Sequence, residues 1–267
     1  MVDRSDLDDL VTKALHHPIQ GWDFSWLSKE GRFQEEALPW DYSDLVARRA
    51  RHSPDLLDLG TGGGELLASL TPHPPRTLAT ESYPPNVRVA ARRVAPLGIQ
   101  VIHSSPPVDN ALQRDSDSRG SLPFRDGAFH LVIDRNEAFV AREVARVLVP
   151  GGVFLTEQSG SAEIPGLYRL LEMSPPSPRG PNWTLDLAKE QLTRAGLKPF
   201  GGGEAHFAMS FRDVGALVWY LQAVPWALPG FSVERYHARL ERLHSRTKDR
   251  GPMRVPRYAF WVEVRKE

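Results

Sequence analysis

The sequence has no cysteine among its 267 residues. This absence excludes disulfide bonds, zinc sites built from cysteine and catalysis by a thiolate, and it fits a reducing compartment. The sequence also lacks an excess of one charge, since 33 basic residues balance 33 acidic ones. Proteins that bind nucleic acid over their whole surface are usually strongly basic, so the overall charge argues against that class and leaves a local basic patch open.

Long hydrophobic runs are absent as well. No apolar stretch approaches the roughly 20 residues that a membrane-spanning helix needs, and residues 1–6 do not form a signal-peptide pattern. We therefore expect a cytoplasmic protein that has no membrane partner. The hydrophobic share of 41% and the charged share of 25% are close to those of globular proteins, and the length suits one large α/β domain.

The most informative stretch is 56–65, which reads LLDLGTGGGE. An apolar run that ends in glycines and leads into further leucines predicts a buried strand, a tight turn and the start of a helix. The glycines allow positive φ and let a ligand approach the main chain closely. The spacing does not fit a dinucleotide fingerprint, because Glu65 stands where the last glycine should be, and no P-loop lysine follows Gly64.

The spacing that fits is Asp-x-Gly-x-Gly-x-Gly, at Asp58, Gly60, Gly62 and Gly64. It resembles the first motif of the class I methyltransferases that depend on S-adenosylmethionine (SAM). The alternative is a glycine-rich turn without a ligand. Other segments of the chain carry the same resemblance and favour the first interpretation.

Three further segments support it. Residues 76–81 are predicted to form a second strand that ends on Glu81, 17 residues after Gly64, at the place of the family's acidic second motif. A carboxylate there can accept from both ribose hydroxyls, although a solvated acid at a strand end is the alternative. Residues 122–133 are similar to the stretch before the family's fourth strand, with His130 in place of the usual acid, and 146–152 resembles the passage into its fifth strand.

The resemblance implies an α/β fold. We expect a Rossmann-like, seven-stranded, mostly parallel sheet flanked by helices, with an antiparallel last strand and an N-terminal helical and aromatic lid. The lid is predicted over 1–52, with Trp22 among its aromatic residues, and the catalytic domain over 53–267. Segments 167–183 and 213–250 are predicted as caps or inserts, so that the chain is effectively a single domain.

The implied cofactor is SAM, bound beyond the carboxyl ends of the strands. Asp58 would brace the glycine loop or meet the cofactor's amino group, and Asp134 would face the place of methyl transfer. Where the family usually has an acid for the adenine, this sequence has Ser104, so either Ser104 or an acid from loop 106–121 is left for that contact. The predicted cofactor-binding residues are Tyr42, Asp58, Gly60, Thr61, Gly62, Gly64, Glu81, Ser82, Ser104 and Asp134.

SAM carries the reactive methyl group, so the protein supplies orientation and, where the acceptor bears a proton, a base. The candidates for a base are His206, His103 and Glu157, and for each the alternative is an ordinary polar residue. No metal site is expected. The Asn/Asp-Pro-Pro-Tyr/Phe signature of many amino methyltransferases is absent after the fourth strand, which argues against methylation of adenine N6 in nucleic acid.

The first expectation for the acceptor is a small molecule, such as a metabolite or natural product. Several tryptophans could line an apolar pocket for it, although core packing is the alternative for them. The second expectation is an RNA methyltransferase that uses the basic region 235–257, and the alternative there is a solvated helix face. A SAM-binding protein without activity is a third expectation, disfavoured by the intact glycine loop and Glu81. The tryptophans in question are Trp22, Trp26, Trp183, Trp219 and Trp226.

Overall fold

The structure is a computed structural model that describes residues 4–19, 24–113, 119–161 and 163–267. Trp22 and residues 114–118 of the predicted loop lie outside the described residues. The chain divides into two compact units. Unit 1 comprises Met1–Leu38, Ser161–Ser177 and His206–Tyr258, and unit 2 comprises Pro39–Gly160, Pro178–Ala205 and Ala259–Glu267.

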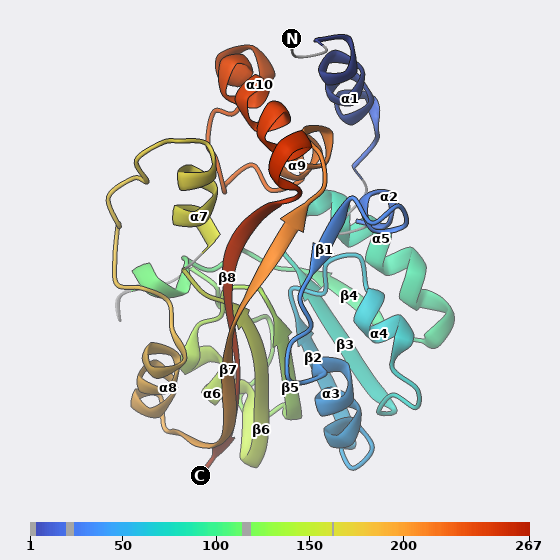
Figure 1. Ribbon diagram of the computed structural model, residues 1–267. Helices are drawn as coiled ribbons and strands as arrows, with labels where there is room; N and C mark the ends of the chain where they lie inside the picture. Colours follow the sequence, from blue (N-terminus) through green and yellow to red (C-terminus); the bar gives the residue numbers. More distant parts are fainter. Residues whose placement is uncertain (1–3, 20–23, 114–118, 162) are drawn as a thin grey trace. The chain divides into compact units, whose positions relative to one another are not determined.

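The strands of the described residues form one sheet in the order β1-β7-β8-β6-β5-β2-β3-β4. The five strands β2 to β6 pair in parallel, and β8 pairs antiparallel with β6. The long strands β7 and β8 run through both units (Figure 1). The bounds are β1 Phe33–Glu35, β2 Asp55–Leu59, β3 Arg76–Glu81, β4 Gln100–His103, β5 Phe129–Arg135, β6 Leu148–Ser159, β7 Leu197–Phe211 and β8 Met253–Lys266.

The predicted Rossmann-like α/β fold is therefore confirmed. The described sheet has eight strands where the sequence predicts seven. The additional strand is β1, whose Phe33 lies opposite Phe211 of β7 in an antiparallel pair. The central strand β2 is buried along its whole length, which explains why the sequence shows it as an uninterrupted apolar run around Asp58.

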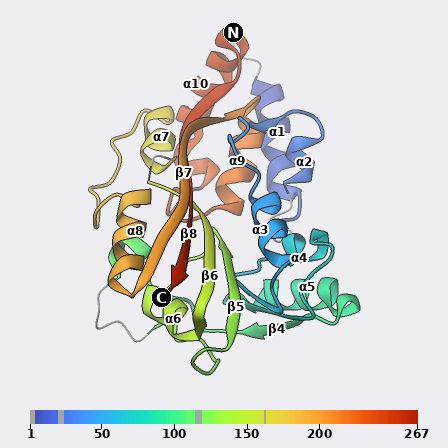
Figure 2. The ribbon, with the colours of Figure 1, turned by 90° about the horizontal axis from the view of Figure 1, so that it is seen from below.

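In unit 2, helices cover both faces of the sheet. Helices α3, α4 and α5 lie on one face, and α6 and α8 lie on the other (Figures 1 and 2). Helix α3 begins after Asp41, whose side chain accepts from the N–H of Asp44, and Gly98 ends the turn after α5 with φ 74°. The bounds are α3 Tyr42–Ala50, α4 Glu65–Ser69, α5 Pro84–Val94, η1 Ala95–Leu97, η2 Asn110–Leu112, α6 Ala141–Val147 and α8 Leu185–Arg194.

Unit 1 is mainly helical around a core of its own. Helix α9 is buried from Val214 to Leu221, and α1 packs against it with Leu7 and Val11. The approach is close, because a Cβ on Gly215 would lie 2.6 Å from the carbonyl oxygen of Leu10. The bounds are α1 Arg4–His16, α2 Ser25–Ser28, α7 Glu163–Leu170, α9 Val214–Ala223 and α10 Val233–Arg250.

Most of the tryptophans that the sequence offers as the lining of an apolar pocket pack in a core instead. Trp219 is buried, and its ring lies 5.4 Å from that of Phe24 and 5.9 Å from that of Trp26. Trp183 is buried in unit 2 beside Phe260. No helix within the described ranges is both long enough and apolar enough to cross a membrane.

Candidate functional site

The glycine loop follows β2 at the carboxyl edge of the sheet. Gly60, Gly62 and Gly64 have φ of 62°, 61° and 79°, a conformation that other residues adopt only at a cost. Gly64 also brings the loop against α5, since a Cβ there would lie 2.9 Å from Cγ1 of Val94. The predicted strand, turn and helix start are thus confirmed, and the neighbouring Thr61 is buried with its N–H donating to the carbonyl oxygen of Thr80 at 2.9 Å.

Glu81 ties the end of β3 to this loop. Its Oε2 accepts from the N–H of Gly62 at 2.7 Å, and its Oε1 accepts from the N–H groups of Ser82 at 2.9 Å and Tyr83 at 2.8 Å. The side chain is buried. A carboxylate offers about four acceptor positions, and three are in use, so a ribose hydroxyl would share the last one or replace a backbone donor.

Asp58 and Asp134 are two further buried carboxyl groups on adjacent strands. Burial raises the pKa of Asp58 to about 7, and the charge of Glu81 adds to the effect. Burial also raises the pKa of Asp134 well above its ordinary value, with contributions from the charges of Glu137 and Asp58. These groups would be satisfied best by a ligand that carries positive charge or donates hydrogen bonds.

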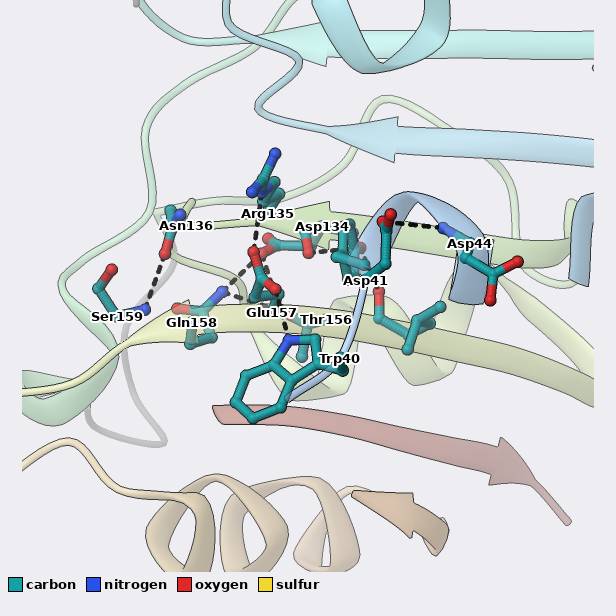
Figure 3. A network of polar contacts seen from close by, with 12 residues as sticks. Trp40, Asp41, Asp44, Asp134, Arg135, Asn136, Thr156, Glu157, Gln158 and Ser159 are labelled. Carbon is teal, nitrogen blue, oxygen red and sulfur yellow. Dashed lines mark hydrogen bonds and ion pairs between the residues drawn. The ribbon is translucent and has the colours of Figure 1, made fainter. Parts of the chain in front are cut away.

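Figure 3 shows how Asp134 is held. Its Oδ1 accepts from the hydroxyl of Thr156 at 2.9 Å and from the amide of Gln158 at 2.6 Å. Its Oδ2 is buried and has no hydrogen-bond partner among the residues that the structure describes. A buried carboxylate oxygen without a partner is costly, and a ligand that donates to it would remove that cost.

Tyr42 is fastened to the backbone of the same strands. Its hydroxyl oxygen lies 2.7 Å from the carbonyl oxygen of Asp134 and 3.0 Å from that of Leu155, and it accepts from the N–H of Asp134 at 3.2 Å. The hydroxyl therefore links the start of α3 to the end of β5 and to an interior residue of β6. That Tyr42 also contacts a cofactor stays a prediction.

The three predicted bases lie in different surroundings. Both oxygens of buried Glu157 are engaged, one by the indole N–H of Trp40 at 2.7 Å and one by the guanidinium of Arg135 at 2.8 Å (Figure 3). His103 is exposed, with Nε2 3.2 Å from the carbonyl oxygen of Ser82. His206 belongs to unit 1, where its ring lies 4.9 Å from that of Tyr258.

A pocket in unit 2 brings several of the predicted residues together. Gly60, Ser82 and Ser104 line it, and the N–H of Ser104 donates to the carbonyl oxygen of Glu81 at 3.0 Å. Asp58, Thr61, Gly62, Gly64, Glu81 and Asp134 support this region without being part of the lining. The remaining lining residues are Leu59, Thr80, Ser105, Pro107, Gly120, Leu122, Glu137, Ala138, Phe139, Val140 and Val144.

Glu137 is a residue that the sequence does not single out as part of the site. Its side chain lies against Gly60, so that a Cβ on Gly60 would lie 2.5 Å from both Cβ and Cγ of Glu137. Burial raises its pKa to about 7, and the charge of Glu81 contributes. The available signal was its place in the loop after β5, at the edge of the sheet where ligands of such folds bind. No group of three or more acidic or histidine side chains suited to a metal ion occurs in the described part of the chain.

Comparison with known proteins shows likeness at the level of structure. No protein-family model matches the sequence, and no curated protein matches it. A candidate methyltransferase from Bacillus halodurans matches with a TM-score of 0.55 at 16% identity, over 85% of this chain and 98% of that one. The YcgJ protein of Bacillus subtilis matches with 0.53 at 17%, over 85% and 98%. A SAM-dependent methyltransferase from Thiobacillus denitrificans, solved with S-adenosyl-L-homocysteine, gives 0.46 at 17%, over 91% and 98%.

The first two of these likenesses extend over most of both chains. The sheet also has the features that the sequence resemblance implies, namely parallel strands β2 to β6 followed by β8, which is antiparallel to β6. At this level of identity the comparison concerns the fold. The chain has the fold of the class I SAM-dependent methyltransferases.

Proposed function

We propose that the protein is a SAM-dependent methyltransferase and that unit 2 binds the cofactor at the carboxyl ends of β2, β3 and β5. The observation that carries the proposal is the glycine loop, whose Gly62 N–H is held by Glu81. The glycine loop and Glu81 at the end of β3 therefore lie side by side, as the binding of an adenosine at such a loop requires.

The residues present fit the chemistry of SAM. The cofactor carries a sulfonium and an ammonium group, and the buried carboxyl groups of Asp58, Glu81 and Asp134 favour positive charge. The Oδ2 of Asp134, which has no partner in the described region, could accept from the ammonium group. Glu81 would accept from the ribose, while the hydroxyls of Ser82 and Ser104 line the nucleoside side.

When bound, SAM supplies a methyl group on a sulfonium sulfur, and the protein has to hold the acceptor in line with it. Asp134 and its neighbours would position the groups at the methyl-transfer end of the site. Asp134 suits this role because Tyr42 fixes its backbone, and Thr156 and Gln158 fix its carboxyl group. Glu157 accepts from Arg135 and Trp40, which use two of its about four acceptor positions, so it stays a candidate for a base. His103 and His206 stay candidates for a base.

For the acceptor we propose a small molecule rather than RNA. Much of the basic region 235–257 is already engaged inside unit 1: Arg242 pairs with Glu172, and Lys248 pairs with Asp6, each at 2.9 Å. Further along, Arg254 pairs with Glu36. Paired side chains leave less positive potential for phosphates, which supports the first expectation.

Calorimetric titration with SAM and with S-adenosyl-L-homocysteine tests the cofactor assignment. We expect both to bind to the wild type and to Glu190→Ala, which changes an exposed acid on α8. We expect no binding to Glu81→Ala and weak binding to Glu81→Gln, which keeps one acceptor oxygen. Thermal unfolding of each variant checks that it is folded. Failure of the wild type to bind either compound would overturn the proposal.

The choice of acceptor is tested separately by binding to bulk RNA at increasing salt. If the acceptor is a small molecule, the protein should bind RNA weakly, and the affinity should change little with salt concentration. A steep fall of affinity with salt, lost on replacing Arg235 and Arg246, would favour the RNA methyltransferase instead.

A further inference from the structure

Glu137 occupies the space over the first glycine of the loop. The position that a Cβ on Gly60 would take lies 2.5 Å from Cβ and Cγ of Glu137 and 2.8 Å from its Oε2. Glycine at this position keeps the main chain open to close approach, and here the approaching group is the protein's own side chain. Glu137 also lines the same pocket as Ser82 and Ser104. This is the pocket in which the proposed function places the nucleoside part of the cofactor.

The backbone on both sides of Glu137 is tied to β6. Asn136 has φ 60°, in the left-handed region that is costly for a residue with a side chain, and its N–H donates to the carbonyl oxygen of Glu157 at 2.8 Å. Its Oδ1 accepts from the N–H of Ser159 at 2.7 Å (Figure 3). The carbonyl oxygen of Glu137 accepts from the amide of Gln158 at 3.0 Å. The main chain is therefore anchored, and movement is left to the side chain.

Two strand ends present titratable groups to Glu137. Glu81 lies at the end of β3 and Asp134 at the end of β5, with Asp58 of β2 close to both. The Ser82 side chain hydrogen bonds to Glu137 and favours its charged form, but burial and the charge of Glu81 act more strongly and raise the pKa of Glu137 to about 7. Below pH 7 the neutral carboxyl group is thus accommodated over Gly60. Above it the charged form is disfavoured there and gains from moving into water.

We propose that Glu137 controls access to the nucleoside pocket: its side chain occupies the place over Gly60 and has to swing out before the adenosine part of the cofactor can reach the loop. The inference rests on the proposed function. It makes Glu137 a determinant of cofactor affinity that opposes binding, in contrast to Glu81, which favours it. Ionisation of Glu137 opens the pocket, so affinity for the cofactor rises as the pH rises through 7.

A pair of variants isolates this effect. Glu137→Ala removes the occupant, and Glu137→Gln keeps a neutral side chain of the same shape at every pH. The ligand is S-adenosyl-L-homocysteine, which has no sulfonium, so that direct attraction to the acidic groups is reduced. If the closed form is about ten times as populated as the open form, removal of the side chain tightens binding about tenfold. Because the charge of Glu137 also raises the pKa of Asp134, the comparison of Glu137→Ala with Glu137→Gln, which both lack that charge, isolates the effect of occupancy.

At pH 6 we expect Glu137→Ala to bind S-adenosyl-L-homocysteine about tenfold more tightly than the wild type, and at pH 8 the two should converge. Glu137→Gln should bind weakly at both values. Equal or weaker binding by Glu137→Ala at pH 6 would overturn the inference. Equal binding would mean that Glu137 does not affect the ligand, and weaker binding would mean that Glu137 contacts it.

A measurement on the free protein separates this inference from the proposed function. The ¹³C resonance of the Glu137 carboxyl group, assigned by its loss in Glu137→Gln, should titrate near pH 7. A midpoint near the ordinary value of 4.5 would show that the side chain lies in water, and it would overturn the inference even if the cofactor binds. Absence of binding by all three proteins, with a midpoint near 7, would instead contradict the methyltransferase assignment.

Discussion

The carboxylate of Glu81 accepts a hydrogen bond from the backbone N–H of Gly62 at 2.7 Å. This bond joins two segments that the sequence presents as separate motifs, one after β2 and one at the end of β3. Because the carboxylate is buried and also accepts from Ser82 and Tyr83, the loop is held in shape by the same group that is proposed to bind ribose. Loss of Glu81 therefore affects both the loop and the ligand.

Gly62→Arg should abolish SAM binding and leave the fold largely intact. Gly62 has φ 61°, so a side chain there costs about 1–2 kcal/mol in backbone strain and fills the ligand's approach to the loop. Gly127→Arg is a matched control, because Gly127 has φ 59° and open space around the added Cβ. Calorimetry should show a loss of binding in the first variant alone, and thermal unfolding checks that both variants are folded. Unchanged affinity of Gly62→Arg would refute the site assignment.

Tyr42→Phe should lower the free energy of unfolding by about 1 kcal/mol, the usual worth of a buried hydrogen bond. The hydroxyl links α3 to the backbone of Asp134 and Leu155, and phenylalanine cannot replace it. Tyr83→Phe is the control, since Tyr83 is 59% exposed. Urea unfolding at neutral pH measures both. Equal stability of the two variants would contradict the role given to Tyr42.

Asp55→Asn should cost stability at neutral pH and little in acid. Burial by itself would raise the pKa of Asp55, but hydrogen bonds from the N–H of His130 and the guanidinium of Arg76 outweigh it and hold the pKa below 3.8. A lowered pKa contributes stability that is complete above the unfolded value, near 3.8, and is lost as the pH falls through the folded value. Unfolding at pH 7 and pH 3 measures the difference. If the free energies of unfolding of wild type and variant differed by the same amount at both pH values, the lowered pKa of Asp55 would be contradicted.

Asp58→Asn should act in the opposite direction. The pKa of Asp58 is raised to about 7, so the folded protein binds an extra proton between about pH 4 and 7 and loses stability as the pH rises through that window. The slope is at most about 1.4 kcal/mol per pH unit for one group. Asparagine removes this loss, and the stability of the variant relative to the wild type should rise between pH 5 and pH 8. A relative stability that does not change with pH would show that Asp58 is not held in its neutral form.

Much of the fold and of the glycine loop could be predicted because local patterns determine them. The buried parallel strands appear as apolar runs, and the turn at Gly60 requires glycine. Helix α7 was missed because Pro165 and Gly166 are typical of turns. Pro165 falls in the first turn, where proline is tolerated, and Gly166 packs closely on Pro256.

Strand β1 has only three residues, and its pairing with β7 is a tertiary property. Glu137 was missed for a similar reason. Its place over Gly60 depends on the left-handed backbone of Asn136 and on bonds from β6, none of which leaves a pattern in the sequence.

The packing of α1 on α9 has a consequence for the order of events on the ribosome. About 200 residues separate the end of α1 at His16 from the start of α9 at Val214. At about 5–20 residues per second, roughly 10–40 seconds pass between the synthesis of the two helices. During that time the apolar side of α1 has no lasting partner, and unit 1 must assemble after most of the polypeptide has been made. The nascent N-terminal segment therefore exposes its apolar side to solvent or to a chaperone until α9 has been made.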